Sequence, residues 1–265
     1  MFTGKGVRGG RLCARGDIVR WLLLVVIILG LSGCGAVAAP APEAAQRTVR
    51  AVIGPDNVAV TIPARPNGTL MIAAHGHGGT VEEWQAGTDQ AALLEALLGA
   101  GYSIASSDAG GNVWGAPASV TAYEDLYHWA AREAGARHVV LLGQSMGGLP
   151  ALQLVGRIPA TAFVGIYPVC NLATMTDKFP TFRQAWPDGA PADLSPVSPP
   201  YPPGFRALFF ASPQDTTVPK ATNTDTCAAV AAAAGADVTV VAAEGEHGDP
   251  SVFQPARVVE FLSAG

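Results

Sequence analysis

Positive charge is scarce in this sequence. Among its 265 residues lysine occurs three times, and 16 Lys and Arg stand against 21 Asp and Glu, for a formal net charge of -5. No basic cluster follows the first twenty residues. Proteins that bind nucleic acid gather Lys and Arg on one surface to neutralise phosphates, so we expect no nucleic acid among the partners of this chain.

Cysteine is also scarce, with four residues and no Cys-x-x-Cys pair. That number is too small for a miniprotein held together by disulfides, and no set of Cys and His has the spacing of zinc ligands. His75-Gly76-His77 could begin a dinuclear metal motif, but Gly79-Thr80 follows where an Asp-His pair would be needed. The sequence therefore predicts no bound metal ion.

The sequence lacks a hydrophobic run long enough to cross a bilayer by itself. Trp21 to Leu31 is apolar except for Gly30, and these eleven residues fall short of the roughly twenty that a membrane-spanning helix needs. The run follows a basic stretch that contains Lys5 and Arg20. A basic stretch followed by a short apolar run is typical of a secretory signal peptide.

Leu31-Ser32-Gly33-Cys34 resembles the lipobox of bacterial lipoprotein precursors, which are cut before a Cys that then carries a lipid. The resemblance implies that residues 1–33 are removed and that lipid on Cys34 anchors the mature chain to the outer face of the cytoplasmic membrane. The alternatives are an ordinary signal peptide or an uncleaved anchor. Residues 34–47 are rich in Ala and Pro, which is typical of a short tether.

Residues 48–265 alternate between β-rich and helical patterns, which predicts one α/β domain. Two runs around a Gly-Pro-Asp-Asn turn predict an antiparallel hairpin, and the apolar runs after it predict a mostly parallel, doubly wound sheet with helices on both faces. The expected strands are Thr48–Ile53, Val58–Ile62, Thr69–Ala74, Tyr102–Ser107, His138–Leu142, Ala162–Tyr167, Arg206–Ala211 and Val238–Ala242. The expected helices are Val81–Leu98, Ala118–Ala134, Met146–Gly156, Thr222–Ala234 and Ser251–Ser263.

Residues 171–204 interrupt this alternation. They contain eight Pro together with Phe179, Phe182 and Trp186, and they show little helical periodicity. A long irregular segment within a compact domain is usually a lid or a binding loop. We therefore predict a short Pro-rich lid here, with a passive surface loop as the alternative.

One short motif indicates chemistry. Gly143-Gln144-Ser145-Met146-Gly147 has the pattern G-x-S-x-G, follows the apolar run His138–Leu142 and precedes a helical segment. In that setting the glycines allow a sharp turn from strand to helix that exposes the serine. We therefore expect Ser145 to be a nucleophile.

With this motif at that place in the order of strands and helices, residues 48–265 resemble the alpha/beta-hydrolase fold family. Catalytic residues of the family follow the order Ser, acid, His along the chain. Asp215 lies just after an expected strand and His247 just after the last expected strand. The resemblance therefore implies a triad of Ser145, His247 as the base and Asp215 as the acid that orients it.

Three other carboxylates compete with Asp215 for the role of the acid. Asp225 lies within an expected helix, Asp237 precedes a strand, and Asp249 follows His247 by two residues. Asp249 is better suited to cap the last helix, since Asp is a preferred N-cap residue. Asp215 stays the expected acid.

The resemblance also implies an oxyanion hole built from backbone N–H groups. Its donors would be the N–H of Met146, the first residue after the nucleophile, and the N–H of His77, with Gly78 as the alternative. Asn112 and Trp114 follow an expected strand at the same edge of the sheet. Because ligands of open α/β sheets bind at that edge, both residues are expected to border the substrate pocket.

Two cysteines of the domain are expected to form a disulfide. Cys170 follows one strand and Cys227 lies in the helix after the next strand, and these strands are neighbours in the resembled fold. An oxidising compartment would allow the bond, which would tie the base of the lid to the helix that follows Asp215. The alternative is a pair of separate buried thiols.

These features together predict a lipid-anchored, extracytoplasmic serine hydrolase that cleaves a small carboxylic ester through an acyl-enzyme, with no cofactor. The alternatives are an envelope acyltransferase or a peptidase with the same triad, or a binding lipoprotein on a hydrolase scaffold without turnover. The expected partners are the ester or acyl substrate and, through Cys34, the membrane. Nothing in the sequence specifies an oligomeric state.

Overall fold

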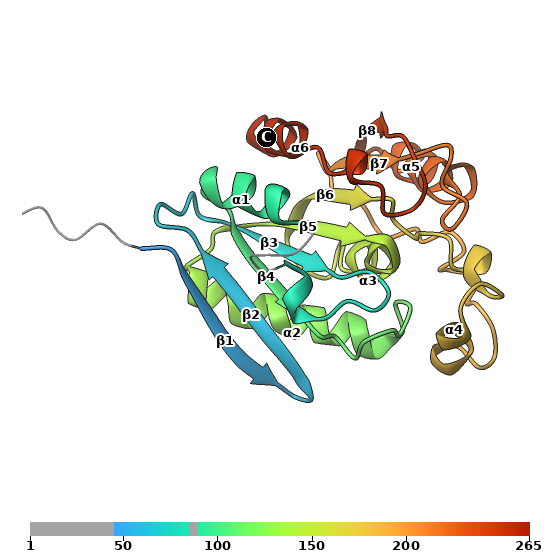
Figure 1. Cartoon of the computed structure of the whole chain (residues 1–265), viewed down its shortest axis with the longest axis horizontal. Helices are drawn as coiled ribbons and strands as arrows, with labels where there is room; N and C mark the ends of the chain where they lie inside the picture. The colour runs from blue at the N-terminus through green and yellow to red at the C-terminus, as the bar shows by residue number, and fades with distance from the viewer. Residues whose placement is uncertain (1–44, 85–89) are drawn as a thin grey trace, which may run out of the picture. The chain divides into compact units, whose positions relative to one another are not determined.

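Eight strands form one sheet in the order β1-β2-β4-β3-β5-β6-β7-β8 (Figure 1). The computed structural model describes residues 45–84 and 90–265, all within one compact unit. The predicted signal peptide, the lipid attachment at Cys34 and the tether up to residue 44 lie outside the described residues. The strands are β1 (Arg47–Ile53), β2 (Asp56–Ile62), β3 (Thr69–Ala74), β4 (Ser103–Ser107), β5 (His138–Gln144), β6 (Ala160–Ile166), β7 (Arg206–Ala211) and β8 (Asp237–Ala242).

The pairing of the strands confirms the predicted fold class. β1 and β2 form the expected antiparallel hairpin, in which Thr48 pairs with Thr61. β2 is also antiparallel to β4, whereas every neighbouring pair from β4 to β8 is parallel. Parallel strands all end at the same edge of a sheet, so the loops that follow β3 to β8 meet there.

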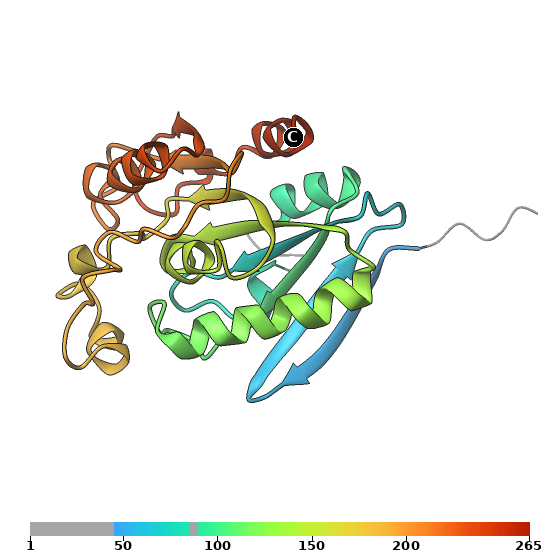
Figure 2. The same cartoon turned by 180° about the vertical axis from the view of Figure 1, so that it is seen from behind.

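Helices cover both faces of the sheet. α1 (Ala91–Gly99) and α6 (Pro255–Ser263) lie together on one face, and α2 (Pro117–Ala134) lies on the other (Figures 1 and 2). The alternation of β3 explains this: Leu70 and Ile72 belong to one apolar cluster, and Met71 belongs to the other. α3 (Gly148–Gln153) and α5 (Thr224–Ala233) contribute to the same cluster as α2.

Four of the five expected helices are shorter than predicted: α3 and α5 lose residues at both ends, and the first and last expected helices are each divided. The expected helix Val81–Leu98 is a 3-10 turn, η1 (Val81–Trp84), followed by α1 from Ala91, and residues 85–89 lie outside the described residues. The expected helix Ser251–Ser263 is η5 (Pro250–Val252) followed by α6, which begins at a Pro that cannot donate to a preceding turn.

The predicted lid contains helical structure that the sequence pattern did not indicate. η3 (Leu172–Met175) and α4 (Pro180–Ala185) both lie within residues 171–204. Each is too short to show a helical period, and Pro180 is at the first turn of α4, where a Pro is well tolerated. In the described ranges no helix is long and apolar enough to cross a membrane.

Candidate active site

Ser145 lies on a sharp turn between β5 and a 3-10 turn, η2 (Ser145–Gly147), that leads into α3. Its φ of 49° is in the left-handed region, which non-glycine residues rarely occupy without a functional reason. A Cβ on Gly143 would lie 2.8 Å from the carbonyl oxygen of Gly147, so the turn can close this tightly only with glycine there. The motif therefore folds into the predicted nucleophile elbow.

The structure brings Ser145, His247 and Asp215 into one hydrogen-bonded row. Ser145 Oγ is 2.9 Å from His247 Nε2, and His247 Nδ1 is 2.7 Å from Asp215 Oδ2. A carboxylate at Nδ1 keeps the proton on that nitrogen, which leaves Nε2 free to accept the serine proton. The row has the geometry that a serine nucleophile needs for activation.

The second oxygen of Asp215 is held by its own loop. Asp215 Oδ1 accepts the backbone N–H of Thr217 at 2.9 Å and that of Val218 at 2.8 Å. The residue is only 4% exposed, so these bonds replace the water that burial removes. Both carboxylate oxygens are therefore fixed, one on the loop and one on His247.

The three other carboxylates considered for the role of the acid have other partners or lie elsewhere in the fold. Asp225 pairs with Lys220, Asp237 is the first residue of β8, and Asp249 Oδ1 accepts the N–H of Ser251 at 2.9 Å. The last of these contacts caps η5, as was expected from the position of Asp249 before the last helical segment. None of the three is hydrogen-bonded to His247 in the part of the chain that the structure describes.

Tyr167 contacts the other side of the histidine, a role that the sequence analysis missed. Its ring centroid is 4.3 Å from that of His247, and its φ of 36° marks a constrained turn after β6. The Tyr167 hydroxyl accepts a hydrogen bond from Gln144 Nε2 at 3.0 Å, and Gln144 Oε1 accepts one from Gln90. The position of Tyr167 at the carboxyl end of a strand was the available signal.

The predicted oxyanion donors lie on two loops that meet at Ser145. Met146 is the second residue of η2, and the first N–H groups of a helix have no acceptor within it. Gly76 lies beside the nucleophile, since a Cβ there would be 3.6 Å from Ser145 Cβ. This arrangement brings the loop that carries His77 to the nucleophile.

The N–H of Gly78, the alternative donor, is hydrogen-bonded elsewhere in this structure. It donates to Asn112 Oδ1 at 2.6 Å, so it is not free for an oxyanion. The left-handed φ of 83° at Gly78 turns this N–H toward the loop after β4. His77 is therefore the remaining candidate on this loop, and Asn112 helps to fix the loop beside it.

A half-buried carboxylate and a buried histidine hold the same loop from inside. Glu83 Oε1 accepts the N–H of Gly76 at 2.9 Å, and burial raises the pKa of Glu83, although this hydrogen bond opposes the shift. The ring nitrogens of His75 lie 2.8 Å from the Gly76 carbonyl oxygen and 3.0 Å from that of Asp108. His75 is thus structural, and no group of three metal-ligating side chains occurs among the described residues.

The lid packs on the oxyanion loop through aromatic side chains. Trp114 is 1% exposed, and its ring centroid is 4.8 Å from Phe179 and 5.6 Å from His77. Thr181 Oγ1 accepts from Trp114 Nε1 at 2.9 Å and lies 3.0 Å from His77 Nε2, and partial burial lowers the pKa of His77. Trp114 is therefore buried between the lid and the oxyanion loop, whereas Asn112 is half-buried.

A disulfide joins the base of the lid to α5. Cys170 and Cys227 are bonded, with Cα atoms 6.3 Å apart and both residues fully buried. Asn223 lies beside the bond, and its Oδ1 accepts the N–H groups of Cys170 and Asn171, each at 3.2 Å. The segment after β6 is thus tied to the segment after β7 by both covalent and polar contacts.

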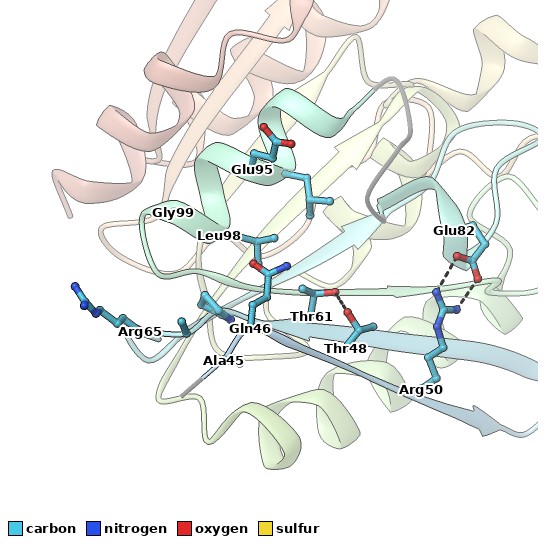
Figure 3. A pocket seen from close by; sticks show the side chains of 13 residues that line it. Ala45, Gln46, Thr48, Arg50, Thr61, Arg65, Glu82, Glu95, Leu98 and Gly99 are labelled. Carbon is cyan, nitrogen blue, oxygen red and sulfur yellow. Dashed lines mark hydrogen bonds and ion pairs between the residues drawn. The ribbon is translucent and has the colours of Figure 1, made fainter. Parts of the chain in front are cut away.

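A large groove lies away from this site, between β1, β2 and α1 (Figure 3). Its volume is about 980 Å³. At its rim the Arg50 guanidinium makes two hydrogen bonds to the Glu82 carboxylate, one of them from Nη2 to Oε2 at 2.9 Å. The hydroxyls of Thr48 and Thr61 are hydrogen-bonded to each other. Its described lining contains no Ser, Cys or His, so we assign it no part in nucleophilic chemistry.

Solved structures share this arrangement of strands and helices. A carboxylesterase from Lactobacillus plantarum WCFS1 gives a TM-score of 0.59 at 17% identity and covers 83% of this chain and 96% of that one. A lipase/esterase from Lactobacillus plantarum gives 0.56 at 16%, covering 82% and 98%. An acylaminoacyl peptidase from Pyrococcus horikoshii gives 0.61 at 14%, covering 83% of this chain and 41% of that chain.

No protein-family model and no curated protein sequence matches the chain. The likeness to the solved structures, with the sheet order and the nucleophile elbow, defines the class: the chain has the alpha/beta-hydrolase fold, as the resemblance in its sequence implied.

Proposed function

We propose that this protein is a serine hydrolase that cleaves carboxylic esters through an acyl-enzyme on Ser145. The observation that carries the proposal is the unbroken row from Ser145 Oγ to His247 and from His247 to the buried Asp215. Three residues from three separate loops meet at hydrogen-bond distance, on an elbow that strains the serine backbone. Such strain is retained where it serves a function.

The chemistry follows from these positions. His247 Nε2 takes the proton of Ser145 Oγ as the oxygen attacks the ester carbonyl, and the imidazolium that forms is stabilised by Asp215. The carbonyl oxygen becomes negative and is bound by the N–H groups of Met146 and His77. His247 then gives its proton to the leaving alcohol, and water repeats the sequence to release the acid.

We propose esters as the substrates because solved esterases are among the structures that share this fold. Two of the three structures described above are an esterase and a lipase/esterase. The third is a peptidase, but this chain corresponds to less than half of that protein. Amide hydrolysis, and transfer of the acyl group to an alcohol in place of water, are therefore alternative outcomes of the experiment described below.

We also propose that the mature protein is anchored outside the cytoplasmic membrane through lipid on Cys34. The support is the lipobox-like Leu31-Ser32-Gly33-Cys34 after a short apolar run. The bond between Cys170 and Cys227 is a second argument, because disulfides persist in oxidising compartments outside the cytoplasm.

Labelling with a fluorophosphonate tests the mechanism, since only an activated serine reacts. The wild-type protein should be labelled and should hydrolyse p-nitrophenyl esters of a graded acyl series faster than an aminoacyl anilide or an acyl thioester. Ser145→Ala should fold normally, show no labelling and retain only background hydrolysis, because loss of the nucleophile abolishes the triad as a unit. Labelling of the Ser145→Ala variant would refute the assignment of the nucleophile.

A further inference from the structure

Lys178 extends from the lid onto the loop that carries Asp215. It lies between η3 and α4, and its ammonium group donates to the carbonyl oxygen of Thr216 at 3.0 Å and to that of Thr217 at 2.7 Å. These two residues directly follow Asp215 in the sequence. The only lysine of the lid therefore binds the backbone of the acid loop.

The two peptide groups that Lys178 binds are the same two that bind Asp215. The carbonyl of Thr216 and the N–H of Thr217 belong to one peptide group, and the carbonyl of Thr217 and the N–H of Val218 belong to the next. Both N–H groups donate to Asp215 Oδ1. In a trans peptide the carbonyl oxygen and the N–H point in opposite directions, so each group lies between the ammonium and the carboxylate.

This arrangement favours one orientation of both peptide groups. The positive charge attracts the carbonyl ends and the carboxylate attracts the N–H ends, so the two charges stabilise the same peptide dipoles. Hydrogen bonds in such a chain strengthen one another, and bonds to charged groups are the stronger kind. Rotation of either peptide would break a bond at each end.

A contact from the histidine loop holds the same turn. Glu246 Oε2 accepts the N–H of Thr216 at 3.1 Å and its hydroxyl at 2.9 Å, and Glu246 precedes His247 in the sequence. On the lid, Thr181 lies three residues after Lys178 and contacts His77 of the oxyanion loop. The lid residues 178–181 are thus bonded to both the acid loop and the oxyanion loop.

We propose that Lys178 is a positioning residue of the active site, which fixes the Asp215 loop through the peptide groups of Thr216 and Thr217 and so makes alignment of the acid depend on a docked lid. The proposal rests on the serine hydrolase function proposed above. Lys178 does not touch the reacting atoms. Its effect passes through Asp215 to His247, so it should alter the rate of reaction at Ser145 more than the binding of substrate.

Lys178→Met tests this, because it keeps the aliphatic stem and removes the donors. In the full mature protein we expect kcat for a p-nitrophenyl ester to fall about ten- to a hundredfold, the scale of loss for small misplacements in a catalytic site. KM should change by no more than about twofold. The rate of fluorophosphonate labelling should fall by the same factor as kcat, and Lys178→Arg should recover part of both.

Two control variants remove a cation without loosening the acid loop. Arg183 lies on the same lid and pairs with the exposed Asp177, and Lys220 pairs with Asp225 beyond the acid loop. Arg183→Met and Lys220→Met should keep the wild-type kcat. If Lys178→Met folds poorly, as judged by its melting temperature, Lys178→Gln provides a second neutral side chain that retains polarity.

The outcomes separate this inference from the proposed function. Wild-type kcat and labelling in a folded Lys178→Met would overturn the role of Lys178 alone. A loss confined to KM would also overturn it, by showing a substrate-binding role instead, and so would an equal loss in Arg183→Met. A wild-type protein that neither labels nor hydrolyses esters would refute the serine hydrolase itself.

Discussion

Removal of the disulfide between Cys170 and Cys227 should destabilise the domain strongly while leaving its fold intact. The bond closes a loop across a sequence separation of 57 residues, which includes the lid, β7 and the Asp215 loop. In the chain-entropy model, releasing a loop of that length lowers the free energy of unfolding by about 4 kcal/mol at 25 °C. For a domain of this size the melting temperature should fall by about 10 °C.

The folded state should survive because other contacts hold the same two segments together. Asn223 is fully buried and bonds to the N–H groups of Cys170 and Asn171, and its Nδ2 donates to Thr174 Oγ1 at 3.1 Å. These bonds do not depend on the disulfide. Alanine at both cysteine positions avoids burying new polar groups, so the entropy of the unfolded chain should dominate the effect.

The assay is equilibrium urea unfolding of the mature wild-type protein and the Cys170→Ala/Cys227→Ala double variant, followed by circular dichroism. The single variant Cys227→Ala is uninformative, since it leaves an unpaired thiol at Cys170. Thiol titration of the denatured, unreduced wild type should detect neither cysteine. A difference in the free energy of unfolding below about 1 kcal/mol, or two titratable thiols, would contradict the reasoning.

Two further substitutions test the site and the anchor. Asp215→Asn should lower kcat by about 10³- to 10⁴-fold, the scale seen when the triad acid of a serine protease is replaced, because the amide favours the wrong tautomer of His247. Asp249→Asn should change kcat less than twofold, and kinetics of the two variants that show the reverse order would make Asp249 the acid. Cys34→Ala should abolish lipid modification and leave soluble or unprocessed protein, which mass spectrometry of the mature N-terminus detects; a lipid-bearing variant would argue against the anchor.

The G-x-S-x-G elbow was predictable because its determinants are local. Gly143 is needed within the motif itself, because a Cβ there would meet the backbone of Gly147 and Gly148, and the strand before it is recognisable as an apolar run. The two ends of β3 and β7 were also predicted to the residue, since a strand buried on both faces ends where apolar residues end. Asp215 and His247 followed from their positions after strands in the resembled fold.

The helix boundaries were less predictable, because short helices depend on contacts with the rest of the fold. η1 and α1 are separate in the structure although their apolar residues continue one pattern across Val81–Leu98. α4 spans six residues, fewer than two helical turns, and so leaves no period to detect. Short helices depend on packing, such as that of Phe182 against the apolar cluster, rather than on their own sequence.

The sequence alone determined the fold class and the elbow at Ser145, because each depends on neighbours in the chain or on the periodicity of a strand, whereas the proposed roles of Asp215 and His247 came from the resemblance to the alpha/beta-hydrolase family. Only the tertiary structure decided that Gly78 bonds to Asn112, that Tyr167 packs on His247 and that Lys178 binds the peptide groups beside Asp215. Each of these contacts joins segments more than 30 residues apart. Their distances are fixed by how the loops meet at the edge of the sheet, which no local pattern records.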